Sequence, residues 1–314
     1  MTVFVLRRLT AGLVLAVLVT LITYLLLSTS FDDVASSVLG NGATPQQIAA
    51  QKVQMGLDRP VAVQYADWLS HAVRGDLGAS YFTSEPVRSA ITARLGVTLS
   101  IVVVALLATS VISVALGVAA AARGGAVDRF AQGAAMIGYL VPSLLVAIAL
   151  VYVLAIKLHV FPATGYTDFS ESPARWASSI AIPVVALMMG GVASLTSQIR
   201  GAMIGELRKD YVRTLRTRGI PTRSIVLRHA LRNAAGPALT VLSLEFIQML
   251  GGALIIEQIF ALPGFGQYAF NASLQGDVPI IMGISLFGVL LVVAVNLVVD
   301  LLGGWLNPKA RMVS

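Results

Sequence analysis

Residues 200–232 read RGAMIGELRKDYVRTLRTRGIPTRSIVLRHALR and form a strongly basic segment in a chain that is otherwise mostly apolar. Only two acidic residues, Glu206 and Asp210, accompany nine cations. The cations are Arg200, Arg208, Lys209, Arg213, Arg216, Arg218, Arg223, Arg228 and Arg232. Long uncharged stretches flank the segment on both sides, so we expect it to be a loop between membrane-spanning helices.

The composition of the chain indicates a membrane protein with several spans. Of its 314 residues, 57% are hydrophobic and 12% are charged, whereas a soluble domain carries about 25% charged residues. A net charge of +7 would suggest nucleic acid as the partner of a soluble protein. Here most of the excess lies in one segment, so we expect a lipid membrane and no nucleic acid. The chain has no cysteine, which excludes disulfides, cysteine nucleophiles and thiolate metal sites.

Six apolar stretches predict six transmembrane helices, since a helix needs about 20 apolar residues to cross the hydrocarbon core. They cover residues 9–29, 95–122, 130–156, 176–199, 236–259 and 278–299. Pro142 and Pro183 fall inside the third and fourth stretches, where we expect kinks. Trp176 and Trp305 lie near predicted span ends. A cleavable signal peptide is the alternative for the first stretch, but its length and the lack of a good cleavage site favour an uncleaved anchor.

The distribution of cations predicts that both termini face the cytoplasm. With the N-terminus inside, the cytoplasmic pieces hold 15 Lys and Arg residues, among them Arg7, Arg8, Lys309 and Arg311, and the outer pieces hold 7. The inverted topology would place the nine-cation loop outside, against the positive-inside rule.

The first outer segment, residues 31–94, contains cap chemistry that predicts a small folded helical subdomain. Three potential helices follow a cap residue and a proline, and two of them end at a glycine. These signals are Thr44-Pro45 and Gly56, then Asp58 or Arg59 with Pro60 and Gly75, then Ser84 with Pro86 before the second span.

Catalytic and metal-binding constellations are not visible in the sequence. His71, His159 and His229 all lie in predicted loops, without partners for a catalytic or metal site. No GxxxxGK[ST] motif occurs, so any ATP that drives this protein would bind to another subunit. We therefore predict a protein that is not itself an enzyme, with no catalytic residues, no metal site and no bound cofactor.

Ionisable residues at membrane depth are costly and are therefore candidates for function. Glu245 is the most deeply placed, and Glu257 with Gln258 lies near the outer end of the fifth span. These residues, with Pro142, are candidates for a translocation pathway. The alternative for Glu245 is a protonated or hydrogen-bonded packing residue.

The basic loop itself predicts a compact helix-turn-helix. Gly219 stops a first helical run, and Pro221 suits the first turn of a second one because no amide hydrogen is needed there. We expect Ile220 and Ile225 to form an exposed apolar knob ringed by arginines, as in a protein-docking surface. The alternative is a solvated basic loop that sets topology or contacts anionic lipid. The first helical run is predicted because the residues Ile204, Leu207, Tyr211 and Leu215 recur at helical spacing.

The stretch YVRTLRTRG (211–219), followed by RHALRNA (228–234), resembles the cytoplasmic EAA loop of ABC importer permeases, EAA-x3-G-x9-I-x-L-P. Gly219 and Leu231 match, whereas Arg213-Thr214-Leu215 replaces EAA, His229 replaces Ile and Arg232 replaces Pro. These departures are those of the dipeptide/oligopeptide branch. Further similar stretches lie at 57–78, 161–166, 257–266 and 276–279, so the resemblance covers essentially the whole chain. The long outer segment resembles the first of the two paired permeases, the DppB/OppB type.

This resemblance implies an all-α polytopic protein with the six-helix type I (MetI-like) importer fold, in a bacterial cytoplasmic membrane. Its parts would be residues 1–30 with the first span, the subdomain 31–94, a five-helix core 95–305 with the coupling loop 200–235, and a cytoplasmic tail 306–314. The implied partners are a second homologous permease, two cytoplasmic P-loop ATPases that bind ATP and Mg, and an extracytoplasmic substrate-binding protein.

The resemblance also assigns roles to residues. The ATPase-coupling loop would comprise Arg213, Arg216, Arg218, Gly219, Ile220, Pro221, Thr222, Ile225 and His229. Binding-protein docking would involve Asp58, Arg59, Trp68 and Asp76. The cargo stays open among dipeptides, longer peptides, glutathione, nickel chelates and haem. A stand-alone secondary transporter is the alternative, although inverted repeats and charged discontinuous helices are not clearly visible.

Overall fold

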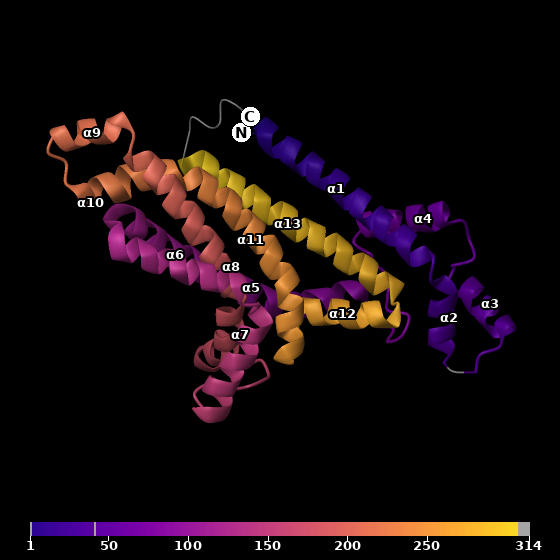
Figure 1. The fold of residues 1–314 in the computed structure, drawn as a ribbon. Coiled ribbons are helices and arrows are strands. Elements are labelled where there is room, and N and C mark those ends of the chain that lie inside the picture. Colours follow the sequence, from indigo (N-terminus) through magenta and orange to yellow (C-terminus); the bar gives the residue numbers. More distant parts are fainter. Residues whose placement is uncertain (1, 41, 307–314) are drawn as a thin grey trace. The chain divides into compact units, whose positions relative to one another are not determined.

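The protein is described from a computed structural model, which covers residues 2–40 and 42–306 (Figure 1). The predictions for the Trp305 side chain, for Lys309 and Arg311, and for the tail beyond Leu306 lie outside the described side chains and residues.

The described residues are helical, apart from turns and one isolated bridge between Ala79 and Pro86. The elements are α1 (Thr2–Ser28), α2 (Phe31–Leu39), α3 (Pro45–Gln54), α4 (Val61–Val73), α5 (Val87–Arg123), α6 (Gly125–Leu140), α7 (Ser143–Leu150), the π-helix η1 (Val151–Lys157), α8 (Pro173–Leu207), α9 (Asp210–Thr217), α10 (Thr222–Ser224), the π-helix η2 (Ile225–Ala230), α11 (Leu231–Ile259), α12 (Phe265–Gln275) and α13 (Val278–Leu306).

Within residues 2–40 and 42–306, five helical stretches are long and apolar enough to cross a membrane, and a bent pair would make a sixth. The five are Val5–Ser28, Val87–Arg123, Pro173–Leu207, Thr222–Ile259 and Val278–Gly304. The pair, Gly125–Leu140 with Ser143–Lys157, corresponds to the predicted third span and is bent by 96°.

The bend in the third span follows from Pro142. Val141, the residue before it, has extended backbone angles, as sterics before a proline favour, and Pro142 becomes the N-cap of α7. The kink expected there is thus a complete break. Pro183, by contrast, lies inside the continuous helix α8.

The chain forms two compact units, and helices α5 and α13 contribute to both. Unit 1 contains residues 1–98 and 263–294, and unit 2 contains residues 99–262 and 295–314. The boundary predicted between residues 94 and 95 falls inside α5, which continues without interruption from Val87 to Arg123.

Unit 1 is held together by the packing of α4 against α1. Tyr65 donates a hydrogen bond to the carbonyl of Val17 (3.0 Å), and Tyr24 donates one to Gln64 Oε1 (2.7 Å). Because these polar groups are buried beside apolar helices, the hydrogen bonds remove a desolvation penalty that would otherwise oppose the packing. The surrounding core comprises Tyr24, Phe31, Val34, Leu57, Tyr65, Val278 and Met282.

The short helices of unit 1 follow the cap signals in part. Thr44 and Gln47 form the reciprocal capping box of α3, and Gly56 and Gly75 adopt positive φ angles of 69° and 86° just after α3 and α4. The predicted cap of α4 is wrong, because its N-cap is Pro60 and receives no side-chain hydrogen bond. Helix α2 was not predicted.

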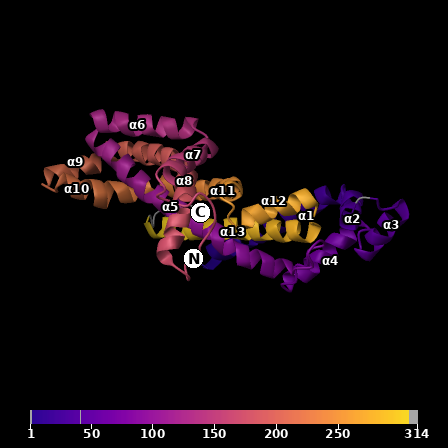
Figure 2. The same ribbon diagram turned by 90° about the horizontal axis from the view of Figure 1, so that it is seen from below.

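In unit 2, α8 packs against α6, α7 and α11 (Figure 2). A Cβ atom on Gly138 of α6 would lie 3.0 Å from the Ala193 side chain of α8. Small residues at such contacts let helices approach closely in a membrane. A core of Val118, Leu195, Ile199, Met203, Val226, Ala230 and Ala234 extends from α8 to η2 and α11, so the basic loop is attached to the packed helices.

Candidate functional site

The basic loop consists of α9 and α10, which are joined by a tight corner at Gly219. The amide of Ile220 donates to the carbonyl of Leu215 (3.2 Å), and the amide of Gly219 donates to that of Arg216 (3.0 Å). This pair of bonds is the Schellman motif that ends many helices. It requires a left-handed residue after the cap, and Gly219 supplies it with φ of 76°.

The second half of the corner begins at Pro221. Its carbonyl accepts hydrogen bonds from the amides of Ser224 (2.9 Å) and Ile225 (3.2 Å), which starts α10. The helix then widens into the π-helix η2 before α11. Such π segments are rare and occur frequently at functional sites. The two helical runs therefore meet at Gly219, as the sequence predicted.

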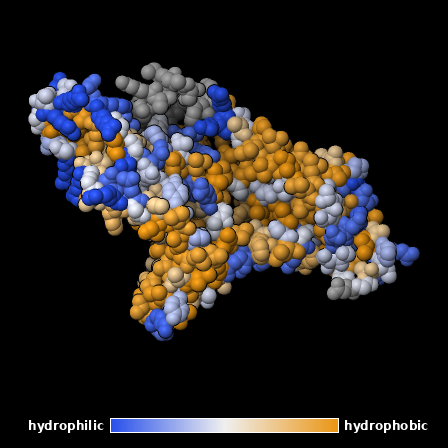
Figure 3. Space-filling model, viewed as in Figure 1, coloured by the Kyte–Doolittle hydropathy of each residue, from blue (hydrophilic) through white to orange (hydrophobic). Residues whose placement is uncertain are grey.

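The corner presents cations rather than apolar groups to the solvent. Figure 3 shows hydrophilic residues gathered over α9 and α10. Ile220 is half-buried, and Ile225 is 1% exposed. The predicted exposed knob is therefore wrong for Ile225, whose side chain is fully buried as part of the amphipathic helix start. The exposed residues of the corner are Arg213, Arg216, Arg218, Gly219, Pro221, Thr222 and Arg223.

The first helical run is interrupted at Arg208 and Lys209, which the sequence did not indicate. Lys209 has extended backbone angles as the N-cap of α9, and its ammonium donates to Glu206. That hydrogen bond raises the pKa of the Lys209 side chain. Helix α9 is thus separate from α8, and Val212 is its buried residue.

A chain of hydrogen bonds connects α8, α9 and α11. Tyr211 of α9 donates its hydroxyl hydrogen to Glu206 Oε2 of α8 (3.1 Å), and Asn233 of α11 donates to the Tyr211 hydroxyl (3.3 Å). Partial burial is the largest cause of the raised pKa of Tyr211. We refer to Glu206, Tyr211 and Asn233 as the loop clamp. Because Tyr211 and Asn233 are 22 residues apart, spacing rules did not reveal the contact.

Two of the histidines, His71 and His229, lie on helices within the segments predicted between the apolar stretches. His71 belongs to α4 and His229 to η2, whereas His159 has a positive φ of 53° beyond η1. His229 is half-buried, whereas Leu227, two residues before it, is exposed. In the part of the chain that the structure describes, no three His, Asp or Glu residues gather as a metal site would require.

Glu245 is the pathway candidate with the most specific surroundings. Its side chain on α11 is 4% exposed, and its Oε2 lies only 3.0 Å from where a Cβ atom on Gly191 of α8 would stand. The missing side chain of Gly191 therefore provides the space for this carboxyl group. Thr109 of α5 borders the same position.

The other pathway candidates do not join Glu245 in one site. Glu257 and Gln258 follow it by 12 and 13 residues on the same helix, which separates them from Glu245 by about 18–20 Å. Glu257 is fully buried, and Gln258 has a buried Nε2 atom without a hydrogen-bond partner among the described residues. Pro142 is exposed at the break between α6 and α7.

Three of the four docking candidates line one cavity in unit 1. The cavity, of about 260 Å³, is bordered by Arg59, Trp68 and Asp76 but not by Asp58. Arg59 pairs with Asp67 (3.1 Å), and Trp68 stacks on Tyr65. Trp68 is therefore partly a packing residue, whereas Asp58 is an exposed surface residue.

Two interactions that organise the units were missed. In unit 1, the fully buried Asp277 accepts hydrogen bonds from Ser80 and from the amide of Tyr81. In unit 2, Asp128 of α6 pairs with Arg200 of α8, with 2.7 Å between Arg200 Nη2 and Asp128 Oδ2. In the sequence, Asp128 and Asp277 stand next to apolar stretches and could have been noticed as isolated charges. Their partners could not be identified, because they are 72 and 197 residues away.

Comparison with known proteins identifies the class to which these helices and this loop belong. The family described as "binding-protein-dependent transport system inner membrane component" matches residues 113–312, and its N-terminal companion family matches residues 1–102. A Brucella abortus protein named as a peptide transport system permease is 36% identical over 312 residues, covering 99% of each chain. A Sinorhizobium fredii protein named as a peptide ABC transporter permease is 35% identical and covers 99% of this chain and 100% of its own.

A third relative is named for a different cargo. The metal-staphylopine import system permease protein CntB of Staphylococcus aureus is 29% identical over 313 residues, covering 98% of each chain. The molecule is thus a multi-pass membrane transport protein. The chain belongs to the family of inner-membrane permease components of binding-protein-dependent ABC importers.

Proposed function

We propose that this chain is a permease subunit of an ATP-driven importer of dipeptides or oligopeptides. The observation that carries the proposal is its similarity, over almost the full length of both chains, to proteins named as peptide permeases. The metal-staphylopine relative indicates that the cargo varies among similar permeases. Glutathione, nickel chelates and haem therefore stay alternatives to peptides.

The proposed complex contains a second homologous permease, two cytoplasmic P-loop ATPases and an extracytoplasmic substrate-binding protein. The ATPases bind ATP and Mg, and this chain binds no cofactor of its own. Membership of a binding-protein-dependent family supports the participation of these partners. In unit 1, the cavity bordered by Arg59, Trp68 and Asp76 is the proposed contact region for the binding protein.

The loop around Gly219 is the proposed coupling element. Its exposed cations suit an acidic or polar groove on an ATPase, and the loop clamp connects it to α8 and α11. When ATP closes the two ATPases, the loop moves as a packed element and shifts α8 and α11 with it. Such rigid-body motion produces alternating access, with Glu245 of α11 as a candidate for the pathway wall.

Purification with and without the proposed partners tests this function. A tagged chain, expressed with its neighbouring transport subunits, is expected to retain a second permease and a P-loop ATPase through detergent extraction. Proteoliposomes of the complex should take up labelled dipeptide only with ATP inside and the binding protein outside. Uptake by the chain alone, driven by an ion gradient, would favour the secondary transporter instead.

Gly219→Asp is expected to separate ATP hydrolysis from transport. The substituted residue cannot adopt the left-handed conformation without strain, although apart from its chain neighbours no described residue lies within 4 Å of a Cβ atom there. Since allosteric coupling energies correspond to roughly 5–150-fold effects, we expect uptake to fall about tenfold or more while the chain still inserts. Uptake and substrate-stimulated ATPase activity in proteoliposomes measure the effect.

Thr217→Asp is the matched control, since it adds the same charge two residues away at an exposed helical position. It should retain most of the uptake if the Schellman corner matters rather than charge alone. Equal losses in both variants would assign the effect to charge, and normal uptake with Gly219→Asp would remove the corner from the coupling mechanism.

A further inference from the structure

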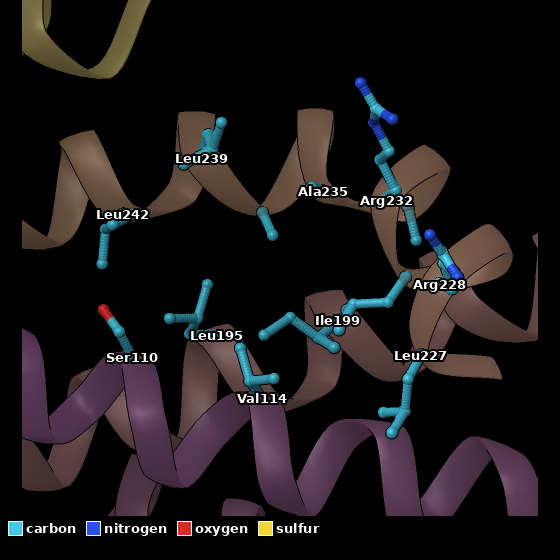
Figure 4. A pocket seen from close by; sticks show the side chains of 13 residues that line it. Ser110, Val114, Leu195, Ile199, Leu227, Arg228, Arg232, Ala235, Leu239 and Leu242 are labelled. Atoms are coloured by element: carbon cyan, nitrogen blue, oxygen red, sulfur yellow. The ribbon is translucent and has the colours of Figure 1, made fainter. Parts of the chain in front are cut away.

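Unit 2 contains a cavity that none of the proposed transport steps uses. It has a volume of about 620 Å³ and lies between α5, α8 and the helical stretch of η2 and α11. Figure 4 shows apolar side chains along its length and two arginines at one end. Its characteristic lining residues are Val114, Leu195, Ile199, Leu239, Arg228 and Arg232.

The two arginines give the cavity a cationic mouth. Arg228 and Arg232 are four residues apart, so their side chains lie on neighbouring turns. Both residues are exposed, and Figure 4 shows both at the end opposite Ser110 and Leu242, with the Arg232 side chain directed away from Leu195 and Val114. No acidic residue belongs to the described lining of this cavity. A ligand that fits is therefore anionic at one end and apolar along the rest.

The length of the cavity matches one leaflet of a bilayer. Leu242 follows Arg232 by ten residues within α11, which corresponds to about 15 Å along a helix. This distance is half of the roughly 30 Å thickness of a hydrocarbon core. The arginines belong to the basic segment that the positive-inside rule places at the cytoplasm. The cytoplasmic leaflet carries anionic lipids, and basic pockets between transmembrane helices bind their headgroups.

We infer that this cavity binds one anionic phospholipid of the cytoplasmic leaflet. The lipid phosphate lies beside the guanidinium group of Arg228, which binds phosphate with directed, charge-assisted hydrogen bonds, and Arg232 on the next turn adds positive charge at the same end. One acyl chain extends along the apolar wall that Val114, Leu195 and Leu239 form. A bound lipid would thereby contact the helix that follows the Gly219 corner. This site is independent of the proposed cargo.

A peptide fits the cavity less well than a lipid. A peptide brings backbone amides and an ammonium group, and each needs a partner when it leaves water. Apart from the arginines, Ser110 provides the polar side chain of the described lining. Its hydroxyl already donates to the carbonyl of Leu106 (2.7 Å). The lining thus satisfies a phosphate and an alkyl chain but not a peptide backbone.

Photo-crosslinking in vesicles tests the assignment. The full-length chain is reconstituted in phosphatidylcholine vesicles with a trace of phosphatidylglycerol that carries a diazirine in its acyl chain. We expect crosslinks in the peptides around Leu195 and Leu239. Unlabelled phosphatidylglycerol should compete, whereas phosphatidylcholine of the same chain length and inorganic phosphate should not.

Two kinds of variant separate the charge from the cavity. A basic residue near an anionic surface contributes about fivefold to binding. For the double variant Arg228→Gln/Arg232→Gln, the concentration of phosphatidylglycerol that halves the crosslink should therefore rise about 25-fold. The control Arg213→Gln/Arg216→Gln, with equal charge loss on α9, should change little. Ala235→Leu, within the lining, should reduce crosslinking without changing charge, and Ala149→Leu on an exposed face of α7 should not.

Several results would overturn the inference. Equal competition by phosphatidylcholine would mean a nonspecific boundary lipid, and competition by inorganic phosphate would mean a simple anion site. Competition by a transported dipeptide would place the cavity on the cargo path. Loss of the crosslink after assembly with the second permease would make the cavity a subunit interface.

Discussion

Glycines end short helices both in unit 1 and in the loop of α9 and α10 in unit 2. The two regions, however, bury different groups. In unit 1, the tyrosines of α1 and α4 are buried and hydrogen-bonded to each other's helices. In the loop, α9 has Val212 as its buried residue, and its polar contacts lie at or near the surface. The same helical architecture thus forms a packed support in unit 1 and an exposed contact element in the loop.

This difference predicts different responses to substitution. Buried hydrogen bonds act in a low dielectric and are costly to break, whereas exposed ion pairs contribute only about 0–1 kcal/mol. Changes in the core of unit 1 should therefore lower stability, and changes in the loop should alter coupling while leaving stability nearly constant.

The largest effect on stability is expected from Gly283→Leu in unit 1. A Cβ atom at Gly283 would lie 2.5 Å from Val87 Cγ1 and 3.0 Å from Ile91 Cδ1. Both neighbours are fully buried, so the added side chain forces α13 away from α5. Overpacking of this kind costs about 1–3 kcal/mol, and thermal unfolding in detergent should show a midpoint lower by several degrees.

Gly288→Leu is the matched control on the same helix, since no side chain or neighbouring helix of the described residues lies within 4 Å of its Cβ position. Its unfolding midpoint should stay close to that of the unsubstituted protein. Equal destabilisation by both variants would indicate a general cost of leucine in α13 and would contradict a close approach at Gly283.

The sequence predicted the elements that depend on local chemistry. The predicted cap residue Thr44 and the glycines at positions 56, 75 and 219 act within a few residues of the chain, although the reciprocal bond from Gln47 was not predicted. The apolar stretches recovered the long helices for the same reason, and a match to a membrane permease family supports the fold class. The residues of the coupling loop, the pathway and the docking region stay predictions.

Features that depend on contacts between distant residues were not predictable. The burial of Ile225 and the separate helix α9 follow from packing of the loop on the transmembrane helices. The space that Gly191 leaves for Glu245 joins residues from two helices. The strength of the break at Pro142 was also underestimated, because a proline permits a range of angles and neighbouring contacts decide among them.

A moderate effect on coupling is expected from Glu206→Ala, which removes the acceptor of the loop clamp. Both Lys209 and Tyr211 donate to this carboxylate. Since one hydrogen bond contributes about 1 kcal/mol, we expect the ratio of uptake to ATP hydrolysis to fall about fivefold. The unfolding midpoint should change little.

Glu206→Gln should restore much of the coupling, because its carbonyl oxygen still accepts from Tyr211. Asp210→Ala is the control, since Asp210 forms only a loose pair with Arg213 (3.6 Å) and both side chains are largely exposed. A lowered unfolding midpoint with unchanged coupling for Glu206→Ala would make the clamp a structural contact alone.

The smallest effect concerns the pH dependence of unit 1. Burial raises the pKa of Asp277 above its usual value, although hydrogen bonds from Ser80 and the amide of Tyr81 oppose the shift. The folded state therefore binds this proton more tightly than the unfolded state does. The stabilisation is complete below the unfolded pKa of about 3.9 and is lost as the pH rises through the folded pKa.

Asp277→Asn removes this titration and keeps one oxygen acceptor for Ser80 or Tyr81. Unfolding midpoints measured from pH 4 to pH 7 should thus decline more steeply for the unsubstituted protein than for the variant. Asp168→Asn is the comparison, because hydrogen bonds from Ser170 lower the pKa of Asp168 and this exposed carboxylate favours stability at higher pH. Parallel pH profiles for Asp277→Asn and the unsubstituted protein would mean that burial does not raise the pKa of Asp277. Ser80 and Tyr81 would then donate to a carboxylate whose pKa is the same in the folded and unfolded states.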